Sequence, residues 1–175
     1  SLLKGWKKAG IKTVKVVDPF LKKNFADLPK TFKPDYIVIA VKPQEIAAVY
    51  PKIRKYKATV ISIAAGISIN AIAAGVGGNK PIIRAMPNLP ATIGKGITGA
   101  FASPKVSPAQ KLAAGKLLKA TGKLVWVDAE DDIDSVTAIS GSGPAYVFLF
   151  MQHMIQAGVY LGLDIADAKK LVLET

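Results

Sequence analysis

The sequence predicts an α/β fold that is followed by an all-helical region. Short apolar runs alternate with segments of helical spacing as far as about residue 128, a pattern typical of an open sheet wound with helices on both faces. From Glu130 onward no segment has the pattern of a strand. We therefore expect a domain boundary near Asp128, with residues 1–128 forming one domain and residues 129–175 beginning a helical one.

The predicted strands are short apolar runs bounded by glycine, proline or charged residues. They cover residues 14–17, 36–41, 59–63, 81–86, 97–102 and 124–127. The run at 36–41 has no polar interruption, which is typical of a central strand of a parallel sheet.

Helical spacing connects these strands, and capping residues mark several of the helix ends. We predict helices over residues 2–10 and 44–56, a short helix capped by Ser68, a helix from Pro108 to a stop at Gly122, a helix over residues 145–161, and a last helix capped by Asp164. The 145–161 segment is apolar on almost every side, so it requires cover on every side. We expect it between subunits or deep in a bundle, with Ser142 as its cap and Pro144 in its first turn.

The composition narrows the class of protein. The 175-residue chain is 50% hydrophobic, has no cysteine and has one histidine. The lack of cysteine excludes disulfides and thiolate metal sites, and we expect no bound metal. No apolar run reaches the roughly 18–20 residues that a membrane span needs. We interpret the chain as part of a cytoplasmic protein with no membrane partner.

The formal net charge of +12 raises the question of a nucleic-acid partner. The lysines are scattered at helical intervals, and the only arginines in the sequence are Arg54 and Arg84. Because base readout favours arginine, we predict no nucleic-acid partner. Solvated helix faces and an attraction for small anionic ligands explain the charge.

Residues 94–99 match the pattern G-x-G-x-x-G, which in dinucleotide-binding proteins brings a strand onto a helix N-terminus. Here a loop that contains prolines precedes the glycines and a strand-like segment follows them. We therefore interpret these glycines as residues of a tight turn rather than as a phosphate-binding site. Residues 75–78 do not fit the pattern either, because they follow a helix and lead into a strand.

Ligands of open parallel sheets bind at the carboxyl ends of the strands. Ala40-Val41-Lys42-Pro43 and Ala64-Ala65-Gly66 each end a predicted strand in small side chains, which lets a flat ligand approach the backbone closely. Lys42 adds a positive charge beside them. Together the two segments favour a nucleotide.

Four motifs, taken in their order along the chain, resemble the pyrroline-5-carboxylate reductase family. They are Ala40-Val41-Lys42-Pro43, Ser62-Ile63-Ala64-Ala65-Gly66, Arg84-Ala85-Met86-Pro87-Asn88 and Thr137-Ala138-Ile139-Ser140-Gly141-Ser142-Gly143-Pro144-Ala145-Tyr146. The resemblance implies a Rossmann-like N-terminal domain and an all-α domain through which subunits form homodimers or rings of dimers. It also implies the reduction of 1-pyrroline-5-carboxylate to L-proline with NADH or NADPH, the final step of proline biosynthesis.

The resemblance also implies roles for single residues. Cofactor-binding residues would be Asp18, Pro19, Ala40, Val41, Lys42, Pro43, Ile63, Ala64, Ala65 and Asn88. Asp18 and Pro19 would end the second strand of the family, where the Asp18 carboxylate would bind the adenosine ribose. Asn88 would order a loop near the nicotinamide, and Glu130 would lie at the substrate end of the cleft. We assign no catalytic acid or base from the sequence.

The family pattern includes a first strand and a glycine-rich turn that would precede Ser1, and helices that would follow Thr175. We expect this sequence to lack both. Two alternatives remain open from the sequence: another Rossmann-type imine or hydroxy-acid dehydrogenase, or a noncatalytic nucleotide-binding module.

Overall fold

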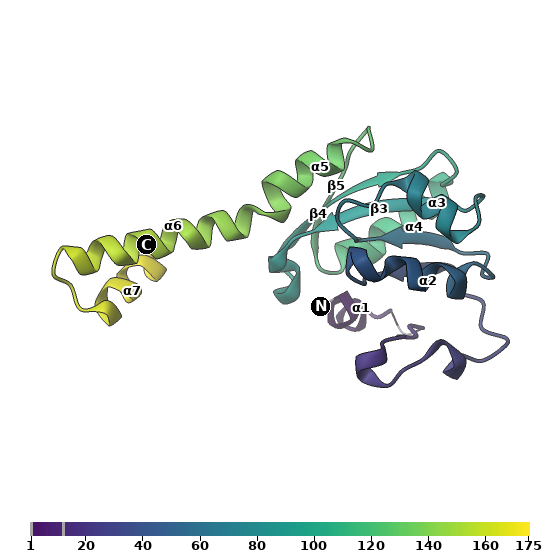
Figure 1. Cartoon of the computed structure of the whole chain (residues 1–175), viewed down its shortest axis with the longest axis horizontal. Helices are drawn as coiled ribbons and strands as arrows, with labels where there is room; N and C mark the ends of the chain where they lie inside the picture. Colours follow the sequence, from purple (N-terminus) through teal and green to yellow (C-terminus); the bar gives the residue numbers. More distant parts are fainter. Residues whose placement is uncertain (1, 12) are drawn as a thin grey trace.

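The structure is a computed structural model that describes residues 2–11 and 13–175 (Figure 1). A five-stranded sheet with helices on both faces occupies one part of the molecule, and a long helix with a shorter partner leads away from it. The expected α/β part and the helical region that follows are both present.

The sheet has the strand order β1-β2-β3-β4-β5. Its strands are β1 (Tyr36–Ile39), β2 (Thr59–Ser62), β3 (Ile82–Pro87), β4 (Gly96–Ala102) and β5 (Gly122–Trp126). The first three run parallel, β4 is antiparallel to β3, and β5 is parallel to β4. Residues 88–95 alone connect β3 to β4, and this is shorter than the dozen or more residues that a parallel crossover needs. The sheet is therefore mixed.

One face of the sheet packs on α2 (Ile46–Ile53) and α3 (Ile69–Val76). The core on this face consists of buried aliphatic side chains from β1, β2, β3 and both helices. They are Ile39, Ile46, Ile53, Val60, Ala64, Ile69, Ile72, Val76 and Ile82. A Cβ at Gly75 would overlap the ring of Tyr50, so glycine is required where α3 crosses α2.

The other face packs on α4 (Pro108–Lys119). Its core joins Ile61, Ile83, Ala85 and Ala100 of the sheet to Ala114 and Leu118 of the helix. The first helix, α1 (Leu2–Lys8), lies against the end of α4, where the Trp6 indole N–H donates to the Leu117 carbonyl at 2.8 Å. This bond satisfies a carbonyl in the last turn of α4, which has no partner within the helix.

The expected strand at residues 14–17 is wrong. These residues have no regular structure. In the described part of the chain, β1 is an edge strand of the sheet and its one neighbour is β2. A strand needs a neighbour for its backbone groups, and residues 14–17 have none in the sheet.

Several other expected boundaries shift. The helix expected at 44–56 divides into η3 (Pro43–Glu45) and α2, which carries Pro51 inside it. Gly122 begins β5 rather than stopping α4, which ends at Lys119. The backbone of Gly122 has φ 145°, and a Cβ there would overlap the Gly96 carbonyl of β4. This close approach requires glycine.

The helical region contains α5 (Asp132–Val136), the π-helical η5 (Thr137–Gly141), α6 (Gly143–Tyr160) and α7 (Ile165–Glu174). Figure 1 shows α6 projecting away from the sheet with α7 folded back beside it. No residue of α6 is buried, so the described chain does not supply the cover that the apolar 145–161 segment needs. No helix in residues 2–11 and 13–175 is both long and apolar enough to span a membrane.

Leu118→Ala should lower the free energy of unfolding by about 2–5 kcal/mol, because it leaves a cavity in the core under α4. Leu112→Ala is the matched control, since Leu112 lies on the same helix with 67% of its surface exposed, against 2% for Leu118. The control should change the free energy by less than about 0.5 kcal/mol. Urea unfolding of both variants checks this, and equal losses would contradict the packing of α4 on the sheet.

Candidate functional site

The parallel strands β1, β2 and β3 bring their carboxyl ends to one edge of the sheet. The segments that leave this edge are residues 40–43 after β1, residues 63–66 after β2 and Asn88 after β3. Eight of the ten predicted cofactor residues lie in these three segments, while Asp18 and Pro19 do not. The edge is where an open sheet of this type binds its ligand.

The segment after β1 has an exposed backbone and a turn that begins with proline. Ala40 and Lys42 are exposed, while Val41 and Pro43 are half-buried. Lys42 has the extended backbone of an N-cap (φ −60°, ψ 147°), and Pro43 begins η3. The backbone of Lys42 therefore lies in the turn that follows β1, and the charge of its exposed side chain suits an anionic ligand.

The segment after β2 is held by two hydrogen bonds at its start. The Ile63 N–H donates to the Ile39 carbonyl at 3.1 Å, and the Ala64 N–H donates to the Ser62 hydroxyl at 3.3 Å. Ala65 is exposed, and Gly66 has φ 72° with no heavy atom within 4 Å of a Cβ built on it. Small side chains and open space would let a flat ring approach this backbone, and the predicted position of a nicotinamide here stays a prediction.

Asn88 orders the loop that follows β3. Its Oδ1 accepts a hydrogen bond from the Ile97 N–H at 3.0 Å, which joins the start of η4 (Leu89–Ile93) to β4. The side chain thus closes the turn between the two strands. The predicted position of this loop near a nicotinamide stays a prediction.

Asp18 and Pro19 lie away from the sheet, in a turn that is closed by a bridge between Asp18 and Lys23. Asp18 caps η1 (Pro19–Leu21), and its Oδ1 accepts from the Phe20 N–H at 2.9 Å. The expectation that these residues end a strand is wrong, for the reason given above for residues 14–17. Their contact with a cofactor ribose stays a prediction.

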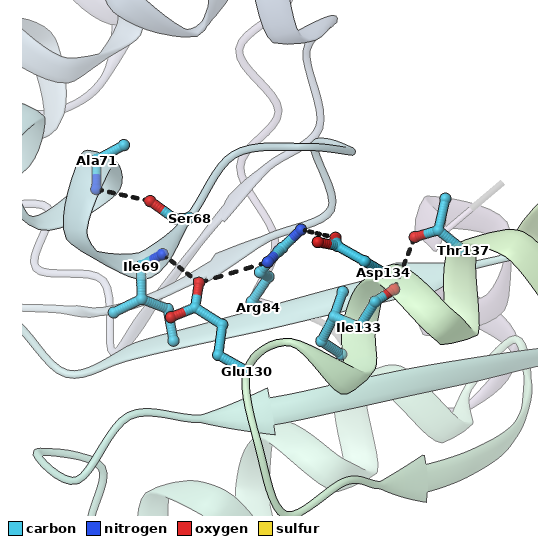
Figure 2. Close-up of polar contacts among 8 residues, drawn as sticks. All are labelled: Ser68, Ile69, Ala71, Arg84, Glu130, Ile133, Asp134 and Thr137. Carbon is cyan, nitrogen blue, oxygen red and sulfur yellow. Dashed lines mark hydrogen bonds and ion pairs between the residues drawn. The ribbon is translucent and has the colours of Figure 1, made fainter.

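Glu130 lies over the α3 face of the sheet (Figure 2). Its Oε1 accepts from the Ile69 N–H at 2.6 Å and pairs with the Arg84 guanidinium at 3.4 Å. Arg84 also pairs with Asp134 of α5 at 2.6 Å. The predicted contact of Glu130 with a substrate stays a prediction, but its carboxylate already serves two partners.

Sequence reasoning missed Arg84 and Asp134 as a pair. The available signal was a charged residue inside the apolar run at 81–86, because a buried arginine is almost always paired. The acid-rich stretch after Asp128 offered carboxylates that could pair with this arginine. The pairing itself depends on which face of the sheet the Arg84 side chain lies on. The sequence does not show this, because Arg84 is the one polar residue in an otherwise apolar strand.

The motif at residues 140–144 lies beside the end of β3. A Cβ at Gly141 would lie 2.8 Å from the Met86 Cε, so this turn packs closely on the Met86 side chain. The Ser142 N–H donates to the Thr137 carbonyl at 2.8 Å, which gives the wide turn of a π-helix. Ser142 is the N-cap residue of α6 and Pro144 lies in its first turn, as expected, but the Ser142 side chain makes no capping hydrogen bond because the chain enters α6 directly from this turn. π-helical turns occur often at functional sites.

A hollow of about 790 Å³ lies at the opposite edge, among residues that precede β1, β2 and β3. Burial lowers the pKa of Lys80, whose ammonium donates to the Tyr56 carbonyl. Burial, and then the Asp35 charge, raise the pKa of Tyr36. None of the predicted cofactor residues lines this hollow. Within residues 2–11 and 13–175, no group of three or more His, Cys, Asp or Glu side chains could hold a metal ion.

Known proteins match both parts of the chain. A family model for pyrroline-5-carboxylate reductase dimerisation matches residues 130–175. The pyrroline-5-carboxylate reductase of Pseudomonas aeruginosa is 46% identical over 144 residues, which are 81% of this chain and 53% of that protein. This chain spans about half the length of the curated relatives it matches.

Two solved structures are similar to the chain. A pyrroline-5-carboxylate reductase from Coxiella burnetii matches with a TM-score of 0.73 and 39% identity, over 80% of this chain and 53% of that one. The pyrroline carboxylate reductase of Plasmodium falciparum, solved with NADP bound, matches with a TM-score of 0.76 and 30% identity. That match covers 99% of this chain and 70% of the other. The α/β part is accordingly Rossmann-like, and this chain belongs to the pyrroline-5-carboxylate reductase family.

Proposed function

We propose that the protein reduces 1-pyrroline-5-carboxylate to L-proline with NADH or NADPH, the final step of proline biosynthesis. The observation that carries the proposal is the set of small-residue segments at the carboxyl edge of β1, β2 and β3 in a chain of this family. A cytoplasmic location is part of the same proposal, and family membership supports it.

The cofactor would be held by residues 40–43 and 63–65. The bound group supplies a hydride for the imine carbon of the substrate ring. The fixed turn at Ile63 and Ala64 would position the nicotinamide ring, and Lys42 would attract the phosphates. Asn88 would hold the loop beside them closed through its bond to the Ile97 N–H.

The remaining work of the chain in this reaction is orientation and exclusion of water. Hydride transfer to an imine needs no protein nucleophile. This agrees with segments at the carboxyl ends of the strands that are rich in alanine, glycine and proline. The π-helical turn at Thr137–Gly141 would form the wall of the cleft beside β3, because Gly141 packs on Met86 there. We assign no catalytic acid or base.

The protein would act as a homodimer or a ring of dimers that assembles through its helical region. The dimerisation family model covers that region, and α6 carries a run of exposed apolar side chains. They are Tyr146, Val147, Phe148, Leu149 and Phe150, each at least 55% exposed. An apolar groove of about 400 Å³ between α6 and α7 continues this surface. Apolar area of this extent on a helix marks an interface.

The intact protein should oxidise a reduced nicotinamide when 1-pyrroline-5-carboxylate is present, measured as loss of absorbance of the dihydronicotinamide. Open-chain 2-keto acids should give no oxidation above background. Activity confined to such acids would favour another dehydrogenase of the same fold. Nicotinamide binding without turnover of either substrate class would favour a noncatalytic module.

The unphosphorylated cofactor should be used at least as well as the phosphorylated one, and Asp18→Ser should shift the balance toward the latter. A carboxylate near the ribose would repel the extra phosphate by about 1–2 kcal/mol at partly solvated distance. Serine can keep the cap on the Phe20 N–H, so the substitution isolates the charge. Lys22 and Lys23 would offset part of this repulsion.

The measurement is the ratio of kcat/KM for the two reduced cofactors at one ionic strength. Asp27→Ser is the matched control, because it removes a nearby carboxylate of the same segment that also accepts a backbone N–H. A ratio that favours the phosphorylated form about tenfold and does not change in Asp18→Ser would show that Asp18 does not bind the ribose.

The intact protein should be at least a dimer in solution, and Phe150→Glu should weaken the assembly. The substitution places a charge within the exposed apolar run of α6, which a partner surface would have to desolvate. Leu112→Glu is the control, since Leu112 has the same 67% exposure on α4. Light scattering over a dilution series should show earlier dissociation for Phe150→Glu alone. A stable, monodisperse monomer for the unmodified protein would contradict the proposed assembly.

A further inference from the structure

Arg84 of the sheet pairs with two carboxylates at the beginning of the helical region, Glu130 and Asp134 (Figure 2). Arg84 is the third residue of β3, Asp134 belongs to α5, and Glu130 lies just before α5. Glu130 also accepts the N–H of Ile69, the first residue of α3. One carboxylate therefore links the start of α3, the central strand of the sheet and the beginning of the helical region.

The charges of this cluster explain why Glu130 is held in one place. The Arg84 side chain is 5% exposed, so its charge requires a partner, and its Nε has none. Asp134 forms the shorter of its two ion pairs but is 70% exposed. Glu130 is 25% exposed and has a second attraction, because the free amides at the start of a helix favour an anion. Arg84 and the α3 N-terminus thus hold the Glu130 carboxylate from two sides.

The segment between β2 and α3 depends on this carboxylate at its far end. Its near end is fixed by the Ile63 and Ala64 amides, as described above. At the far end, the Ser68 hydroxyl accepts from the Ala71 N–H and the Ser68 carbonyl accepts from the Ile72 N–H, and both bonds stay within the start of α3. Ile67 and Ile69 pack in the core on the sheet, and the bond from the Ile69 N–H to Glu130 adds a hydrogen bond that links this end to the stretch before α5.

We propose that Glu130 is a positioning residue that fixes residues 63–68 in the conformation that receives the nicotinamide ring, with Arg84 holding its carboxylate in place. This assignment rests on the proposed function of that segment. It differs from a direct contact of Glu130 with the substrate, because a positioning role acts on the cofactor. The same contacts connect the helical region to the segment proposed to hold the cofactor, because Glu130 and Asp134 both lie where the helical region begins.

Three variants of the intact protein separate this role from general stability. Glu130→Ala removes the acceptor of the Ile69 N–H and one partner of Arg84. Glu130→Gln keeps an acceptor oxygen for the Ile69 N–H and loses the charge. It should therefore retain part of the cofactor binding that Glu130→Ala loses. Asp134→Ala is the matched control, because it removes the shorter ion pair of Arg84 and leaves the bond between Glu130 and Ile69 intact.

Two readouts do not require turnover: hydrogen exchange of the backbone amides in residues 63–69, and the Kd of reduced nicotinamide from its fluorescence. Glu130→Ala should speed exchange across the whole segment and raise both the Kd and the KM for the cofactor about tenfold. The KM for 1-pyrroline-5-carboxylate should change less than about twofold. Glu130→Gln should recover at least half of the change on a logarithmic scale, and Asp134→Ala should stay within about twofold of the unmodified protein.

A rise in the KM for the imine with an unchanged cofactor Kd would overturn the proposal, because it would place Glu130 on the substrate. Equal effects of Asp134→Ala and Glu130→Ala would overturn it in favour of a general structural role, as would unchanged exchange in residues 63–68. An unmodified protein that binds reduced nicotinamide but does not turn over the imine would refute the proposed reaction alone. Absence of nicotinamide binding would refute both.

Discussion

The buried charge of Arg84 in the central strand is the constraint on which the arrangement of sheet and helices depends. A guanidinium that is almost fully covered requires carboxylates within contact distance, and Glu130 and Asp134 supply them at 3.4 and 2.6 Å. Glu130 lies in the short stretch that leads from β5 into α5, and Asp134 lies in α5 itself. Their pairing therefore determines where the helical region begins over the sheet, and it brings Glu130 to the start of α3.

Glycines then allow the helical region to approach the sheet closely. A Cβ at Gly99 of β4 would lie 2.6 Å from the Val136 Cγ1, and one at Gly141 would lie 2.8 Å from the Met86 Cε. These two contacts place α5 and the π-helical turn along the β3–β4 half of the face that α2 and α3 cover elsewhere. The chain consequently enters α6 beside the carboxyl edge of β3, next to the segments proposed to hold the cofactor. The π-helical turn adjusts the direction of the helix at that point.

The same route leaves α6 outside the globular part, where it contacts α7 and exposes apolar side chains on its other sides (Figure 1). The family model for pyrroline-5-carboxylate reductase dimerisation matches this region. The sheet forms a hydrophobic core on each of its faces from residues of this chain. The apolar side chains of α6 stay exposed, and a further surface would be needed to cover them.

The sequence by itself determined the elements whose pattern is local. The strands β1 to β5 and the helices α3, α4 and α6 follow from apolar runs and helical spacing, and Ser68 caps α3 as expected. The carboxyl-edge segments, including Ala40 and Ala64, followed from the parallel order of the first strands, and the four motifs indicated the family. Residues 14–17 failed as a strand because a strand exists only where a neighbour accepts its hydrogen bonds, and apolar composition alone does not supply one. The domain boundary near Asp128 stays a prediction. Tertiary structure alone decided the antiparallel step at β4, the Arg84 cluster and the bond between Glu130 and the Ile69 N–H, because these depend on which distant groups meet across the sheet, and sequence patterns report only neighbours along the chain.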